Sequence, residues 1–307
     1  MTTTLDWLGC ATFRLRTAGL TILLDAYVDR AANAPGSGLT ADDIDECDWV
    51  VVGHAHFDHL YGAERITVNT GATLVAGYES VRLMEAAGVP AERMLCVAGG
   101  ERVDLGHGVS VRVFPSQHSC VWSQGQMSQP DEVCLGDLGV TLQEQQRRLQ
   151  ELTLQMAASL DPSAVEHFFT AAPGHSSRGD GGALIFLFET PEGSLLFQDT
   201  TGHWSGVIAG LSPDVAILAA AGRANVDGEP VQGTLADFIA EQARVLGPRR
   251  VVLAHHDDWL PGFSVPTNVA PIREALARRA PDVELVEPGY LDATPIFDGL
   301  GRRTTTP

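Results

Sequence analysis

The sequence predicts an α/β or mixed α+β fold, and three observations lead to this prediction. Short apolar runs rich in Val, Ile, Leu and Thr recur along the chain, separated by Gly and Pro, which is typical of strands. Segments with helical periodicity lie between several of these runs. The segment 5–24 holds two or three strands joined by short turns, which indicates antiparallel hairpins. No G-x-G-x-x-G sequence follows the first strand, so a Rossmann fold is disfavoured.

The remaining elements are predicted from the same two patterns, apolar runs for strands and apolar residues at helical spacing for helices. Eight apolar runs are predicted as strands: 20–24, 49–53, 73–76, 109–114, 183–189, 194–198, 215–219 and 250–254. Three segments with apolar residues at helical spacing are predicted as helices: 80–87, 235–246 and 270–279.

The region 119–173 departs from this alternation. It has little strand signal and a polar section rich in Gln, Ser and Pro, followed by a helix that begins at the capping box from Thr141 to Glu144. The helix carries an apolar stripe formed by Leu149, Leu152, Met156 and Leu160. Two interpretations stay open: the helix packs on the main core, or the region forms a lid or a dimer element over an active site.

Charge and composition exclude several classes of protein. The 307 residues include 20 Lys+Arg and 39 Asp+Glu, which gives a net charge of −19, and no basic patch offsets it. Such a chain repels polyanions, so we expect no nucleic-acid partner and no anionic membrane partner. No apolar run approaches the ~18 residues that span a bilayer. The five scattered cysteines suggest no disulfide framework, so we expect a reducing, cytoplasmic location.

The most informative segment is His54-x-His56-x-Asp58-His59, directly after an apolar strand. Two histidines two residues apart in extended backbone point the same way, and a following turn brings the Asp-His pair back towards the same cavity. Imidazole and carboxylate ligands suit zinc, with iron or manganese as alternatives. Solvated loop histidines are the other interpretation, which we disfavour because three imidazoles and a carboxylate are costly to place together without a metal.

This motif resembles the signature of the metallo-β-lactamase superfamily, H-x-H-x-D-H after a strand. Later segments fit the other ligand positions of that family: V-R-V-F-P-S-Q-H ends at His118, L-L-F-Q-D ends at Asp199, and V-V-L-A-H ends at His255. The resemblance implies a four-layer αββα sandwich of two mixed sheets with outer helices. It implies a single domain over 1–300, with a helical insertion at about 119–173 and a frayed tail at 301–307.

The resemblance also implies a binuclear site with two divalent ions, Zn²⁺ first and Mn²⁺ or Fe as alternatives. One ion would be held by His54, His56 and His118. The other would be held by Asp58, His59 and His255, with Asp199 bridging and Asp25 in support. The neighbouring His256 competes with His255 for the last position.

The opening W-L-G-C-A-T-F, residues 7–13, is similar to the branch that includes ascorbate-6-phosphate lactonase. Cys10 replaces the histidine of that branch, and Gln198 replaces the glycine before the bridging aspartate. These departures leave metal binding intact but do not carry over the lactonase's substrate. Cys10 is either a small buried hydrophobic residue or a thiol in the pocket.

The sequence contains four further histidines and one arginine whose relation to the site has to be considered. His175 and Arg178 either contact substrate or belong to an ordered loop, and His175 competes with His118 as a ligand. His203 either contacts substrate or supports a metal ligand. His107 and His167 are predicted to be ordinary surface residues.

The predicted function is a hydrolase that uses a metal-bound hydroxide on a small ester, lactone or amide. Asp58 would ligate a metal and also accept and return a proton. The alternative is a phosphodiesterase acting on a small phosphate ester or phospholipid, and a lesser one is a non-catalytic metal-binding protein. Redox chemistry is disfavoured because di-iron relatives carry Glu where His56 stands. The expected partner is a small molecule, and a homo-oligomer stays open.

Overall fold

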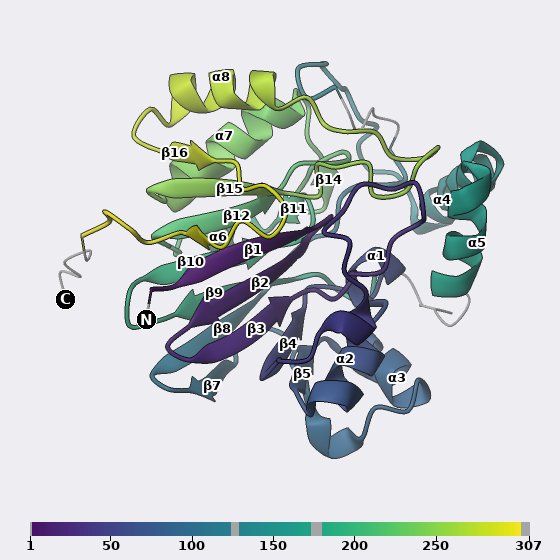
Figure 1. Ribbon diagram of the computed structural model, residues 1–307. Helices are drawn as coiled ribbons and strands as arrows, with labels where there is room; N and C mark the ends of the chain where they lie inside the picture. Colours follow the sequence, from purple (N-terminus) through teal and green to yellow (C-terminus); the bar gives the residue numbers. More distant parts are fainter. Residues whose placement is uncertain (1, 124–128, 173–179, 302–307) are drawn as a thin grey trace.

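Two seven-stranded sheets pack face to face in the computed structural model, which describes residues 2–123, 129–172 and 180–301 (Figure 1). The first sheet has the order β17 (Thr294–Pro295), β1 (Thr4–Gly9), β2 (Thr12–Thr17), β3 (Leu20–Leu24), β4 (Trp49–Val52), β5 (Thr73–Ala76) and β6 (Met94–Cys96). Strands β17 to β3 pair antiparallel, as expected for the opening hairpins, and β3 to β6 pair parallel.

The second sheet also combines three parallel and three antiparallel pairings. Its order is β16 (Glu284–Val286), β15 (Arg250–Ala254), β12 (Val215–Ala219), β10 (Ser194–Gln198), β9 (Leu184–Glu189), β8 (Val109–Pro115) and β7 (Arg102–Gly106). Strands β16 to β10 are parallel, and β10 to β7 are antiparallel. A small third sheet joins β11 (Gly202–His203), β13 (Asn225–Val226) and β14 (Glu229–Pro230).

Helices cover the outer faces of both sheets. The helices α2 (Ala63–Thr70) and α3 (Tyr78–Ala86) lie on the first sheet, and α7 (Leu235–Leu246) and α8 (Val269–Arg279) lie on the second (Figure 1). The two mixed sheets with outer helices therefore confirm the predicted four-layer arrangement. The shorter helical segments are two 3₁₀ turns at Ala41–Asp43 and Ala91–Arg93, α1 (Phe57–Leu60) and α6 (Ser205–Ile208).

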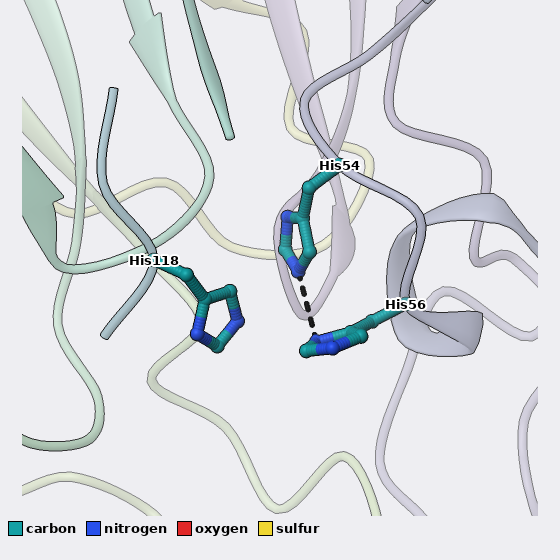
Figure 2. Close-up of side chains that lie close together, drawn as sticks. All are labelled: His54, His56 and His118. Atoms are coloured by element: carbon teal, nitrogen blue, oxygen red, sulfur yellow. Dashed lines mark hydrogen bonds between the residues drawn. The ribbon is translucent and has the colours of Figure 1, made fainter. Parts of the chain in front are cut away.

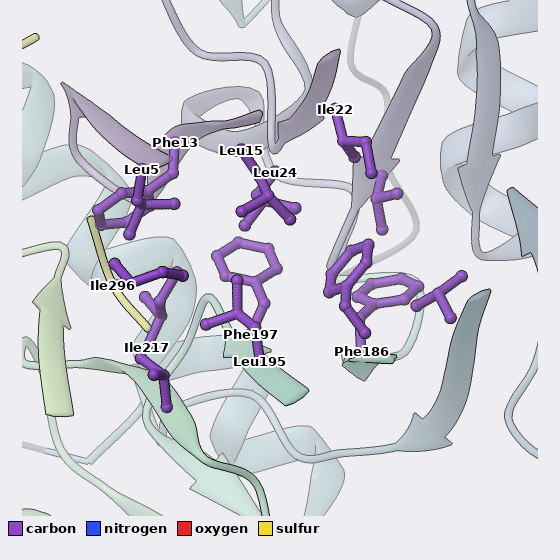
Figure 3. Packing of buried hydrophobic residues seen from close by; sticks show 14 of the residues in the cluster. Leu5, Phe13, Leu15, Ile22, Leu24, Phe186, Leu195, Phe197, Ile217 and Ile296 are labelled. Carbon is purple, nitrogen blue, oxygen red and sulfur yellow. The ribbon is translucent and has the colours of Figure 1, made fainter. Parts of the chain in front are cut away.

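Successive side chains along each strand point alternately into the space between the sheets and towards the outer helices. On β2 and β3, Phe13, Ile22 and their alternate neighbours point between the sheets, where Phe186 and Phe197 of the second sheet meet them (Figure 3). The intervening residues point outward and pack under the helices, as Leu23 does. Because both faces of the central strands are buried, these strands read as continuous apolar runs, and all eight predicted strands are present.

The described part of the region 119–173 includes two helices, α4 (Leu142–Ser159) and α5 (Pro162–Ala171), at one end of the sandwich (Figure 1). The predicted start of α4 is confirmed, since the Thr141 hydroxyl accepts a hydrogen bond from the Glu144 amide at 3.4 Å. The α5 helix was missed, although Asp161 before Pro162 is a helix-start signal: the Asp161 carboxylate accepts the Ser163 amide at 3.0 Å.

The turn between α4 and α5 is fixed to the body of the protein. The Asp161 amide donates to the Pro261 carbonyl at 3.0 Å. A Cβ at Gly262 would lie 2.3 Å from the Ser159 carbonyl oxygen, so only glycine permits this approach of two backbones. Between Leu142 and Ser159, all of which are described, no residue of α4 is buried, whereas α5 buries Ala164 and Ala171. No helix among the described ranges is both long enough and apolar enough to cross a bilayer.

Candidate metal centre

The predicted donors all follow strands that end at the same edge of the sandwich. His54 lies two residues after β4, Asp199 and His255 directly follow β10 and β15, and His118 lies three residues after β8. Three of these strands, β8, β10 and β15, run in the same direction in the second sheet, because β10 and β15 are both parallel to β12 and because β8 and β10 are both antiparallel to β9. The carboxyl ends of the strands therefore bring residues distant in sequence to one place.

Three histidines form the first donor group. The donor atoms of His54, His56 and His118 lie within 4.8 Å of one another, and their rings face a common point (Figure 2). The ring centroids of His54 and His118 are 4.7 Å apart, and those of His56 and His118 are 4.6 Å apart. His118 Nδ1 donates to the Ser119 carbonyl at 2.9 Å, which leaves Nε2 as the free lone pair.

Asp58, His59 and His255 form a second group beside the first. His255 Nε2 lies 3.1 Å from Asp58 Oδ2, and His59 Nε2 lies 3.5 Å from the same oxygen. Asp25, predicted as a support, holds His59 Nδ1 at 2.7 Å and accepts the Gly53 amide at 2.9 Å. Asp25 therefore orients the His59 ring and ties it to the end of β4.

Asp199 lies between the two groups. It is fully buried, with Oδ2 2.6 Å from His54 Nδ1 and 3.4 Å from His59 Nδ1. Within the described part of the chain, Asp199 Oδ1 has no hydrogen-bond partner, which is costly for a buried carboxylate oxygen. A Cβ at Gly53 would lie 2.1 Å from Asp199 Oδ2, so a side chain there would displace the carboxylate.

The electrostatics of the cluster favour a bound cation. Burial and the nearby imidazoles hold the pKa values of His54 and His56 well below the ordinary range, so their lone pairs are free for a metal. Burial, with the Asp199 charge beside it, raises the pKa of Asp25 to about 7, and burial also raises the pKa of Asp199. Positive charge between these acids would offset the cost of ionising them.

Asp58 and His59 respond to each other. Burial alone would raise the pKa of Asp58, but the His59 and His255 rings hold it well below its ordinary range. The carboxylates of Asp58 and Asp25 raise the pKa of His59 well above its ordinary range. The two carboxylates therefore favour positive charge at this position.

Three non-glycine residues around the centre have left-handed backbone: Cys10, Asp25 and His255, with φ of 51°, 55° and 58°. Such conformations cost about 1–3 kcal/mol each and persist where surrounding contacts impose them. The His255 amide donates to the Cys10 carbonyl at 2.8 Å, and the Asp25 amide donates to the Val51 carbonyl at 2.8 Å. Cys10 is fully buried with its Sγ 3.6 Å from the Asp58 carbonyl, close to the Asp58 and His255 donor atoms.

A buried network that the sequence did not reveal holds the Cys10 turn. Asp257 accepts the Cys10 amide at 3.1 Å and the Tyr290 hydroxyl at 3.1 Å, and Arg30 Nη2 lies 3.5 Å away. Isolated Arg, Asp and Tyr positions far apart in the chain give no local pattern by which sequence reasoning could find this network.

The structure separates the two adjacent histidines near the C-terminus. His255 faces Asp58, with Nε2 near the Asp58 carboxylate. The ring of His256 instead stacks on Trp7, with ring centroids 4.4 Å apart and planes 9° apart. Trp7 stacks in turn on Tyr290 at 4.5 Å. The geometry therefore favours His255 over His256 as the last donor.

Other predicted residues have different outcomes. His175 and Arg178 lie outside the described residues. His203 is buried on β11 and stacks on Phe238 at 5.3 Å, away from the donor cluster's cavity, so its predicted contact with substrate stays a prediction. The prediction that His167 is an ordinary surface residue is wrong: its Nε2 lies 2.7 Å from the Tyr27 hydroxyl, because α5 packs on the core.

Burial of His203 gives a testable pH dependence. Burial lowers its pKa from 6.5 to about 4, so between these values the unfolded chain binds a proton that the folded chain does not. Stability is therefore lost as the pH falls from 6.5 towards 4. We expect the free energy of unfolding to fall by about 1–2 kcal/mol more in the wild type than in His203→Phe when urea denaturation is compared at pH 7.5 and pH 5. Equal losses would show that His203 makes no such contribution.

A cavity of about 370 Å³ opens onto the donors. Its polar end is formed by His56, Asp58, His118, Asp199 and His255. Its other walls are largely apolar and include aromatic residues that the sequence analysis did not single out: Phe57, Phe168, Trp259 and Phe263. The volume lies at the small end of the usual range for small-molecule sites.

Comparison with known proteins agrees with this architecture. A family model described as the beta-lactamase superfamily domain matches residues 21–136. A metal-dependent hydrolase of Caldivirga maquilingensis is 34% identical over 116 residues, which is 38% of this chain and 48% of the relative. A metal-dependent hydrolase of Methanopyrus kandleri is 32% identical over 115 residues, covering 38% and 47%. The chain thus spans about half the length of the curated relatives it matches.

Solved structures share the fold over nearly the whole chain. Igni18, a metallo hydrolase of Ignicoccus hospitalis, superposes with a TM-score of 0.60 and 16% identity, covering 94% of this chain and 97% of that one. An isothiocyanate hydrolase from Delia radicum gut bacteria gives a TM-score of 0.54 and 14% identity, covering 94% and 96%. Fold and donor cluster together define an αββα sandwich with a candidate metal centre. Over residues 21–136, the chain is similar to the beta-lactamase superfamily domain.

Proposed function

We propose that this chain is a metal-dependent hydrolase that cleaves a small carboxylic ester, lactone or amide with the help of two divalent ions. The observation that carries the proposal is the convergence of seven nitrogen and oxygen donors from four strand ends beside one small cavity. The donors are His54, His56, Asp58, His59, His118, Asp199 and His255.

The donor chemistry fits this assignment. His54, His56 and His118 would hold one ion, and Asp58, His59 and His255 the other, with the unpartnered oxygen of Asp199 available to bridge. Imidazole and carboxylate together suit Zn²⁺ first, with Mn²⁺ or Fe as alternatives. When bound, such ions polarise a substrate carbonyl and make water acidic near neutral pH.

The chain's own residues would supply proton transfer and orientation. Asp58 stays a carboxylate because of its low pKa, so its Oδ atoms can accept a proton from water and return it to the leaving group. His255 and His59 fix Asp58 Oδ2, and Asp25 fixes His59. The cavity confines one small molecule, which agrees with a net charge of −19 that disfavours polyanionic substrates.

The relatives support the class of reaction rather than a substrate. Two relatives described as metal-dependent hydrolases each match 38% of this chain, and neither description names a substrate. The five cysteines, all reduced in the structure, agree with a cytoplasmic location.

A substrate panel tests the proposal. Protein reconstituted with Zn²⁺, Mn²⁺ or Fe²⁺ is assayed on esters, lactones, amides, thioesters and phosphodiesters, with chelator-treated protein as the control. We expect metal-dependent turnover of at least one carboxylic ester, lactone or amide. Turnover of phosphodiesters alone would replace the proposal with the phosphodiesterase alternative, and no turnover in any class would support a non-catalytic metal protein.

A further inference from the structure

The α4 helix has an apolar stripe that the described part of the protein covers only incompletely, with Met156 packed at the edge of a buried cluster. Leu149, Leu152 and Met156 lie at helical spacing on one face, yet each stays partly exposed. All three line the cavity that ends at the metal donors. An amphipathic helix normally buries such a stripe against a core, so this one faces a space that another apolar group can fill.

Other apolar side chains that line the cavity lie next to the donors themselves. Phe57 lies between His56 and Asp58 in the sequence, and its ring is 5.5 Å from Phe168 of α5. Trp259 stands edge-on to His255, with ring centroids 5.2 Å apart. The cavity therefore has donors for a reacting group at one end and apolar side chains around the rest.

Fixed contacts hold this wall in place. The turn between α4 and α5 is bonded to Pro261 and pressed against Gly262, and His167 of α5 binds the Tyr27 hydroxyl. These contacts fix α5 and the turn that precedes it, and the α4 stripe on the other side of that turn lines the cavity.

A neighbouring cavity of about 500 Å³ offers a different environment. It shares Val121, Leu152 and Gly222 with the first, but its other walls are mainly polar. Two arginines there, Arg147 and Arg148, are already paired with Glu144, Glu151 and Asp137. The apolar part of a ligand therefore belongs under α4, in the first cavity.

We propose that the cavity under α4 binds an alkyl or acyl chain, so that the substrate is an ester, lactone or amide of a medium-chain carboxylic acid. This inference rests on the proposed function for the bond that is cleaved, but the apolar site itself does not depend on turnover. Leu152, at the centre of the stripe, is the residue on which the preference for long chains should depend most.

The test compares chain length in two variants of the same helix. p-Nitrophenyl esters from acetate to octanoate are assayed with metal-loaded wild type, Leu152→Gln and Leu154→Gln. Leu154 is 71% exposed on the outer side of α4 and is the matched control, and glutamine preserves helix propensity in both variants. We expect kcat/KM to rise about three- to fourfold for each added methylene in the wild type until the cavity is filled. Leu154→Gln should keep both this slope and the wild-type turnover of the acetate ester, and Leu152→Gln should flatten the slope.

A binding measurement separates this inference from the proposed reaction. Isothermal titration calorimetry of the metal-loaded protein with the carboxylates acetate, butyrate, hexanoate and octanoate requires no turnover. Affinity that rises with chain length in the wild type and Leu154→Gln, but not in Leu152→Gln, supports the apolar site even if no ester is cleaved. Esters cleaved without any dependence on chain length, or equal slopes in the two variants, would overturn the inference while leaving the hydrolase proposal standing.

Discussion

Asp58→Asn is expected to lower kcat by about 10³-fold or more on any substrate that the metal-loaded protein cleaves. General-base groups contribute about 10²–10⁴-fold, and Asn can neither accept a proton nor bind a metal as a carboxylate does. The change should not unfold the protein, because Asn preserves the shape of the side chain and can still bond to His255. Steady-state kinetics with circular dichroism of the same samples measures both effects.

The control for Asp58→Asn is the same substitution on the surface. Asp42→Asn removes a carboxylate that is 64% exposed and contacts Arg65 and Asn69, and we expect its kcat to equal that of the wild type. If Asp58→Asn kept more than about a tenth of the wild-type kcat, the assignment of proton transfer to Asp58 would be wrong.

His255→Ala should remove most of the activity and about one equivalent of bound metal, whereas His256→Ala should retain both. The two residues are adjacent, yet only His255 reaches Asp58, and His256 packs on Trp7. Loss of the His256 stack should instead lower the free energy of unfolding by about 1 kcal/mol. Metal content by inductively coupled plasma mass spectrometry and urea denaturation distinguish the two variants. The reverse pattern, with metal lost only in His256→Ala, would make His256 the ligand.

Much of the fold could be predicted because burial on both faces makes its central strands continuous apolar runs. The eight predicted strands and the helices at 80–87, 235–246 and 270–279 are confirmed within one or two residues at most ends. The short strands β6, β11, β13, β14, β16 and β17 were missed, since segments of two or three residues have too few positions to show a period, and the five-residue edge strand β7 was missed as well.

The donor positions were predictable for a different reason. Four donors lie within six residues after one strand, and the others directly or closely follow strands whose apolar runs are clear. The preference for His255 over His256 came from the family resemblance, because the directions of the two rings depend on left-handed backbone at His255 and on Trp7, far away in the sequence.

The walls of the cavity depend on tertiary contacts. In the sequence, Phe57, Phe168 and Trp259 look like ordinary core residues. They are brought together only by the packing of α5 and of the segment after β15 that carries Trp259. His167 was misjudged for the same reason, since α5 was not predicted. Sequence reasoning thus located the chemistry better than the surface that selects a substrate.

The metal content of the purified protein tests the central claim most directly. The protein is expressed with supplemented Zn²⁺, passed through a desalting column and measured by inductively coupled plasma mass spectrometry, with His54→Ala as the depleted reference. Two groups of donors around Asp199 predict about two equivalents of metal per chain in the wild type and at most one in the variant. A wild-type chain that holds no tightly bound metal, or the same amount as His54→Ala, would contradict the account.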